Sequence, residues 1–147
     1  MGLSLALKFL GKTQVIGIKT EPYSASEVLR GFELSVQELA AKNCVSCEGV
    51  KPMTRREAEQ SLRGLHGWAL HDHTIEKEFP FSTYLNGLDF AYGVGKIAEK
   101  QDHHPDILIR WRKVKVSLST HSIKGLSQND FIIAAKAELK YRDSGFG

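Results

Sequence analysis

The amino-acid sequence predicts an α+β domain in which helices cover one face of a four-stranded antiparallel sheet. Short strand-like runs come in two pairs, each joined by a polar turn. Segments with helical periodicity precede, separate and follow these pairs, which gives the order αββαββα. Hairpins place strands antiparallel, and each helix has an apolar stripe to bury against the sheet. The 147 residues, 41% of them hydrophobic and 25% charged, suffice for one such domain and an extension.

The first helix and the first hairpin follow one another after residue 53. Thr54 and Glu57 have the spacing of a capping box, and apolar residues from 58 to 65 recur on one face, so we expect a helix that ends near Gly64. Two short strands follow at 68–71 and 75–79, and the polar residues 72–74 form the turn between them.

A longer helix is expected from Ser82 to about Asp102. Apolar residues recur there at three- to four-residue spacing, and Ser82 is suited to cap the first turn. Pro105 ends the helix, because the residue before a proline is pushed out of the helical region. His103 and His104 therefore lie at the end of this helix.

The second hairpin and the last helix complete the domain. Strands at 106–111 and 114–120 are expected on either side of a turn at 112–113, and residues 114–118 alternate strictly between apolar and polar. The last helix should run from Ser127 to about Tyr141, with apolar residues recurring on one face.

Histidines and carboxylates concentrate between residues 99 and 130. Asp102, His103 and His104 precede a proline, and His121 follows a predicted strand. Imidazole is the side chain whose unperturbed pKa lets it both give and take a proton near neutrality. Glu99 lies one helical turn before His103, where it could orient that imidazole. The pattern indicates an acid/base site, although adjacent histidines before a proline also fit a solvated helix end.

These residues, in this order and spacing, resemble the signature of the pterin-4a-carbinolamine dehydratases. The matching elements are Ala98–Pro105, Trp111, Leu118–His121, Gly125–Ser127 and Asp130, within a resemblance that covers roughly residues 44 to 141. The resemblance implies the α+β fold described above. It also implies that the substrate is a 4a-hydroxytetrahydropterin, which loses water to give the quinonoid dihydropterin in tetrahydrobiopterin recycling. Ile107 departs from the pattern, since many members have an aromatic residue there.

The resemblance implies a role for each candidate residue. His103 and His104 would be the acid/base pair, and His121 would assist proton transfer or hold the pterin. The implied substrate-binding residues are Glu99, Asp102, Ser119, Thr120 and Asp130. Asp130 also has capping-box spacing from Ser127, and the two roles are compatible. The reaction delivers one proton to the departing hydroxyl and removes one from the neighbouring ring nitrogen, so we expect no metal or cofactor. Which histidine is acid and which is base stays open.

Two other functions compete with the dehydratase. Cys44 and Cys47 form a Cys-x-x-Cys pair that could join His66 and His71 in a zinc-binding module, although the gap of 18 residues exceeds the usual finger spacing. Relatives in animals also act as dimerisation cofactors of a homeodomain transcription factor, a role that would use an exposed helix face.

We also expect a homodimer or homotetramer. An open sheet leaves edges that are usually covered or paired. The expected contact is the edge of strand 114–118 or the last helix, where residues 131–133 and Tyr141 offer more apolar surface than one face needs.

Charge and the N-terminal residues bear on partners and location. The 20 basic and 17 acidic residues are interleaved, which predicts no direct nucleic-acid binding, and no apolar run is long enough to cross a membrane. Two cysteines do not make a disulfide framework, which favours a reducing, cytoplasmic location.

Residues 1–43 are expected to be a targeting or flexible extension before a domain at 44–147. Their early lysines and leucines, with a faint helical face, make a mitochondrial location the alternative, and another helix is expected between Ser26 and Ala40.

Overall fold

The computed structural model describes residues 6–9, 12–15 and 35–146, and the chain divides into two compact units, Met1–Phe32 and Glu33–Gly147. In the first unit, β1 (Ala6–Phe9) and β2 (Lys12–Val15) pair antiparallel. A helical face in this stretch was therefore the wrong expectation. The rest of the predicted targeting segment lies outside the described residues.

The second unit contains the predicted domain. Its elements are α2 (Val36–Ala41), α3 (Arg55–Leu62), β3 (Ala69–His71), β4 (Thr74–Pro80), α4 (Tyr84–Gln101), β5 (Asp106–Arg110), β6 (Lys113–Leu118), the 3₁₀ turn η1 (His121–Ile123) and α5 (Gln128–Asp143). The strands form one antiparallel sheet in the order β3-β4-β6-β5. The α+β class and the order αββαββα are confirmed. The compact unit also includes α2, which the sequence placed in the extension.

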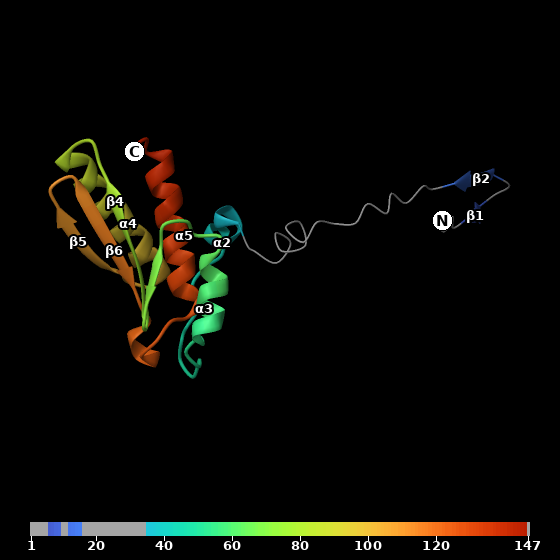
Figure 1. Cartoon of the computed structure of the whole chain (residues 1–147), viewed down its shortest axis with the longest axis horizontal. Coiled ribbons are helices and arrows are strands. Elements are labelled where there is room, and N and C mark those ends of the chain that lie inside the picture. The colour runs from blue at the N-terminus through green and yellow to red at the C-terminus, as the bar shows by residue number, and fades with distance from the viewer. Residues whose placement is uncertain (1–5, 10–11, 16–34, 147) are drawn as a thin grey trace. The chain divides into compact units, whose positions relative to one another are not determined.

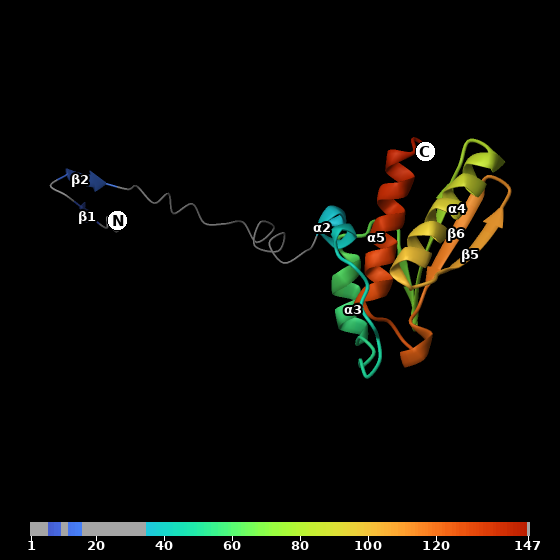
Figure 2. The same cartoon turned by 180° about the vertical axis from the view of Figure 1, so that it is seen from behind.

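The helices lie on the apolar face of the sheet (Figure 1). Along β6, Val114, Val116 and Leu118 are fully buried and alternate with polar residues, as predicted. Helix α4 contacts β5, β6 and α5, and α2 packs against α5. Figure 2, seen from behind, confirms that α5 lies between the sheet on one side and α2 and α3 on the other.

The opposite face of the sheet is polar. Glu76 on β4 faces Lys115 on β6 at 3.1 Å, and Glu78 faces Lys113 at 2.7 Å. Cross-strand pairs of opposite charge suit a solvated sheet face. The prediction that helices pack on one face of the sheet is therefore confirmed. No helix in the described part of the chain is long and apolar enough to cross a membrane.

The two surfaces that were expected to form a subunit contact are largely covered within the domain. Strand β6 is central, and the edges are β3 and β5. Residues 131–133 of α5 are at most 2% exposed, because α5 is covered by the sheet and α4 on one side and by α2 on the other. The edge of strand 114–118 and residues 131–133 are therefore not free for a subunit contact, and a contact through the rest of the last helix stays a prediction. Exposed apolar residues instead include Tyr84, Leu85 and Tyr92 on α4, and Leu108, Ile109 and Trp111 on or next to β5.

Candidate active site

A pocket of about 450 Å³ opens where three separate segments of the domain meet. Its walls are the segment 44–47, the residues 101–104 at the end of α4, and the loop 119–122, with Asn129 of α5. Six of the eight candidate residues line it: Asp102, His103, His104, Ser119, Thr120 and His121. The structure thus brings all three candidate histidines to one cavity.

The end of α4 directs His103 into this pocket. Asp102 caps the helix in the left-handed conformation, with φ of 50°, and its N–H and that of His103 both donate to the carbonyl of Ala98. The chain therefore leaves the helical path one residue before His103. The side chain of His103 is 10% exposed and meets Asp130, with 2.7 Å between Nε2 and Oδ1.

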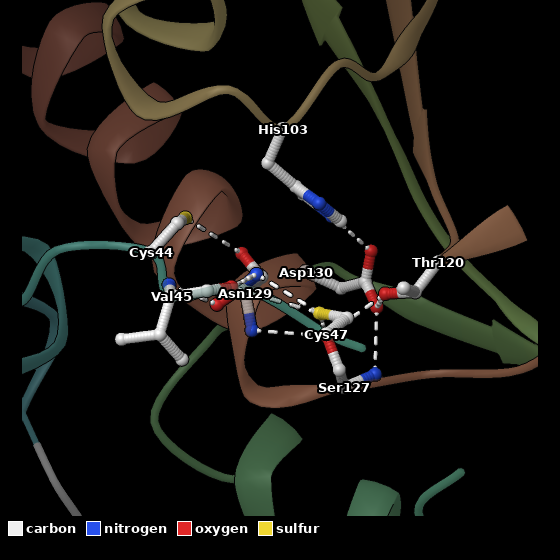
Figure 3. Close-up of polar contacts among 8 residues, drawn as sticks. All are labelled: Cys44, Val45, Cys47, His103, Thr120, Ser127, Asn129 and Asp130. Carbon is white, nitrogen blue, oxygen red and sulfur yellow. Dashed lines mark hydrogen bonds and ion pairs between the residues drawn. The ribbon is translucent and has the colours of Figure 1, made fainter. Parts of the chain in front are cut away.

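Asp130 is a fully buried carboxylate that accepts three hydrogen bonds (Figure 3). Besides His103, its Oδ2 accepts from the Thr120 hydroxyl and from the backbone N–H of Ser127, each at 2.8 Å. The Ser127 bond belongs to the predicted capping box of α5, which is confirmed. Asp130 does not line the pocket, so it is placed to hold His103 from behind.

The hydrogen bonds of Asp130 assign the tautomer of His103. With an ionised Asp130, which can only accept, the proton of His103 is assigned to Nε2, and Nδ1 then has a free lone pair. Among the described residues, no buried side-chain nitrogen or oxygen lacks a hydrogen-bond partner, and no residue bonds to Nδ1. Nδ1 is therefore not fully buried, and His103 is one of the residues that line the pocket. This arrangement leaves an unbonded ring nitrogen on a residue that lines the cavity.

His104 has a different environment. Its Nε2 lies 3.0 Å from Oε2 of Glu99, and the two side chains are 56% and 84% exposed. We expected Glu99 to orient His103, and that expectation was wrong. The left-handed turn at Asp102 breaks the helical spacing, so His104 rather than His103 lies beside Glu99. Glu99 does not itself line the pocket.

The segment 44–47 forms a pocket wall that sequence reasoning missed. Asn129 holds it at both ends of its amide: Oδ1 accepts from the N–H of Val45 at 3.1 Å, and Nδ2 donates to the Val45 carbonyl at 2.7 Å (Figure 3). Gln101 accepts from the N–H of Cys44 at 2.8 Å. The only sequence signal in this segment was the Cys-x-x-Cys pair. That pair suggested a zinc site and did not indicate that the segment lines a pocket.

The two cysteines contact Asn129 rather than histidines. Asn129 Nδ2 donates to the sulfur of Cys47 at 3.1 Å, and the thiol of Cys44 faces the Asn129 carbonyl at 3.9 Å. Burial raises the pKa of the Cys44 thiol to about 11. In the described part of the chain, no three His, Cys, Asp or Glu side chains are arranged to hold a metal ion. The zinc arrangement with His66 and His71 is therefore not assembled.

Comparisons with known proteins agree with the fold. A sequence profile of the family described as Pterin 4 alpha carbinolamine dehydratase matches residues 51–139. The chain belongs to the pterin-4a-carbinolamine dehydratase family. A protein of Nitrosospira multiformis named "Putative pterin-4-alpha-carbinolamine dehydratase" is 40% identical over 112 residues, which cover 76% of this chain and 99% of the relative. A relative with the same name from Alkaliphilus metalliredigens is 41% identical over 106 residues, 70% of this chain and 96% of its own.

A solved structure of the family has the same fold. The crystal structure of a transcriptional coactivator/pterin dehydratase from Brucella melitensis is 30% identical to this chain and superposes with a TM-score of 0.60. The match covers 62% of this chain and 99% of the Brucella protein. The resemblance noted in the sequence is thus confirmed at the level of family and fold.

Proposed function

We propose that this protein dehydrates a 4a-hydroxytetrahydropterin to the quinonoid dihydropterin. Family membership supports the reaction class. The observation that carries the proposal for this chain is the contact of 2.7 Å between His103 and the buried Asp130, which leaves Nδ1 unbonded on a histidine that lines one pocket with His104 and His121. A volume of about 450 Å³ lies in the range of small-molecule sites.

His103 is the proposed base. Its Nε2–H donates to Asp130, and the free Nδ1 accepts the proton of the ring nitrogen N5. The imidazolium that forms is stabilised by the Asp130 carboxylate, which is fixed by two further donors. Since Asp130 is fully buried, this support does not depend on an exposed and screened ion pair.

His104 is the proposed acid. In its protonated form it pairs with Glu99 and donates its other ring proton to the 4a-hydroxyl, which leaves as water. The electrons of the N5–H bond form the new double bond between N5 and C4a as the C4a–O bond breaks. The elimination is balanced by one proton accepted and one proton given, and His121 lies on the same pocket to hold the ring or assist transfer.

The pH dependence of turnover tests this assignment. Loss of the base in His103→Gln should remove the fall in rate on the acidic side of the profile, whereas loss of the acid in His104→Gln should remove the fall on the alkaline side. The spontaneous dehydration must be subtracted at each pH. The opposite pattern would exchange the two roles, and unchanged profiles in both variants would exclude the pair as the acid and base.

A second function is consistent with one surface of the molecule. The Brucella relative is described as a transcriptional coactivator as well as a pterin dehydratase. In this chain, Tyr84, Leu85 and Tyr92 are exposed on α4, with Leu85 and Tyr92 more than two-thirds accessible. Exposed apolar clusters of this kind commonly mark protein contacts. We propose that this face of α4 or the β5 edge binds a second copy or a protein partner, and that the pocket is not needed for it.

A further inference from the structure

A second, smaller pocket borders the candidate active site, and His121 lines both. It has a volume of about 230 Å³ and shares Ser119, Thr120 and His121 with the candidate active site. Its other walls come from His73 and Thr74 at the β3–β4 turn and from residues 124–125 after η1. Residues 119–121 therefore line both cavities.

The loop that lines both cavities is held in place. Thr120 and Gly125 form an antiparallel bridge, in which the N–H of Thr120 donates to the Gly125 carbonyl at 2.8 Å. A Cβ at Gly125 would meet Cβ of Pro52 at 2.6 Å, so this closure requires glycine. Lys124 lies beside it in the left-handed conformation, with φ of 52°. The ring of His121 and the Lys124 side chain are thus presented from a closed loop.

The second pocket offers hydrogen-bond donors that no protein group uses. Within the described residues, the side chains of His73, Thr74, His121 and Lys124 have no hydrogen bond or ion pair, and no carboxylate lines this cavity. The first pocket differs, because it includes the Asp102 carboxylate. A ligand group that bears oxygen acceptors would therefore suit the second pocket.

The structure of the proposed substrate indicates which of its groups would enter the second pocket. The reaction occurs at C4a and N5, and C6 is the next ring atom after N5. A substituent on C6 therefore projects beside the reacting centre. A three-carbon chain with two hydroxyls has five heavy atoms, which need roughly 150 Å³ at about 30 Å³ per atom. This is less than the cavity of about 230 Å³.

We propose that the cavity formed by His73, Thr74, Lys124 and Gly125 is a subsite for an oxygen-bearing substituent at C6 of the pterin. The inference rests on the proposed dehydratase function. It assigns His73 and Lys124 to substrate selectivity rather than to proton transfer. It also places His121 at the junction between the ring and its substituent.

Two substrates and two variants test the subsite. The 4a-hydroxytetrahydropterins are compared with a methyl group or a dihydroxypropyl group at C6. Lys124→Met and His73→Phe should each raise KM for the dihydroxypropyl substrate about tenfold, as expected for one lost hydrogen bond to a ligand. They should leave kcat unchanged, and KM for the methyl substrate should also be unchanged. Lys96→Met, on the exposed surface of α4, is the matched control.

Binding of stable compounds separates this inference from the proposed function. The 7,8-dihydropterins with the same two substituents can be titrated by calorimetry without any turnover. A preference for the dihydroxypropyl compound that Lys124→Met abolishes would support the subsite even if no dehydration occurred. Equal binding of both compounds, absence of binding, or KM values that rise equally for both substrates would overturn it. Failure of dehydration alone would overturn the proposed function.

Discussion

Replacing Asp130 with asparagine should inactivate the site while the fold survives. The carboxylate accepts from His103 at 2.7 Å and from Thr120 and Ser127 at 2.8 Å each. An asparagine can keep its oxygen toward Thr120 and Ser127, which preserves the cap of α5. Its NH₂ group must then face His103 Nε2. His103 would have to accept there, so its proton would move to Nδ1 and the pocket would lose its base.

The magnitude follows from these contacts. Exchanging one charged acceptor for a neutral amide and removing the charge at the start of α5 should lower the free energy of unfolding by about 1–3 kcal/mol. This is a minor part of the 5–15 kcal/mol typical of a domain. The loss of a positioned proton acceptor should lower kcat by about 10²- to 10⁴-fold. Activity should therefore fall far more than stability.

Three measurements on Asp130→Asn check this reasoning. Stopped-flow absorbance gives kcat, urea unfolding gives stability, and ¹⁵N NMR of the imidazoles reports the tautomer of His103. Asp89→Asn, at an exposed position on α4, is the control and should change none of them. A folded Asp130→Asn protein with the turnover of the original chain would refute the positioning role.

Four further predictions concern the thiols, the core and the surface. Replacing Cys44 and Cys47 together with serine should leave dehydration active, and a strong chelator should not change it; a stoichiometric zinc whose removal abolished turnover would contradict this. The pKa of Cys44 is raised from 9.0 to about 11, so at pH 8 its thiolate fraction should be about a hundredfold smaller than that of an ordinary thiol. Alkylation of Cys44, followed by mass spectrometry, should therefore be slow at pH 8, and its rate should rise with pH until about pH 11. Ile133→Glu should lower the unfolding free energy by about 4 kcal/mol or more, because it buries a charge at a fully buried position. Leu85→Glu, at a 68% exposed position, should leave stability within about 0.5 kcal/mol and weaken self-association in sedimentation, and an unchanged sedimentation coefficient would remove α4 as the contact.

Local signals in the sequence were sufficient for the helices and strands between residues 54 and 143. The capping boxes at Thr54 and Ser127 are each made by a residue and the one three positions later, and both form as predicted. The start of α4 was misplaced by one residue, since Thr83 rather than Ser82 accepts from the N–H of Asn86. Neighbouring hydroxyl residues compete for the same cap, and sequence alone does not decide between them.

The sequence was less informative about which helices and strands lie beside one another. The alternation of residues 114–118 shows that β6 has one buried face, but it does not show which strands lie beside it. In the structure β6 pairs with both β4 and β5, so it is not an edge. The same limit applies to α5, whose residues 131–133 seemed too apolar for one face. Helix α2 covers its second side, and α2 lies in a part of the chain that the sequence assigned to an extension.

In the site, too, local sequence patterns located residues but did not predict their partners from distant parts of the chain. The motif located the histidines, but their partners depend on the backbone. Glu99 was assigned to His103 by helical spacing, and the left-handed residue Asp102 transfers it to His104. The partner of His103, Asp130, is 27 residues away and was known only as a candidate. The wall at 44–47 depends on Asn129, a contact across 84 residues that no local pattern indicates.

The dehydration rate of the purified full chain and its histidine variants tests the central claim most directly. The substrate is generated in situ, and quinonoid dihydropterin is followed by absorbance after subtraction of the spontaneous rate. We expect the original chain to accelerate the reaction, and we expect His103→Ala and His104→Ala each to lower kcat by about 10²- to 10⁴-fold while remaining folded. Turnover near that of the original chain in both folded variants, or no acceleration by the original chain, would contradict it.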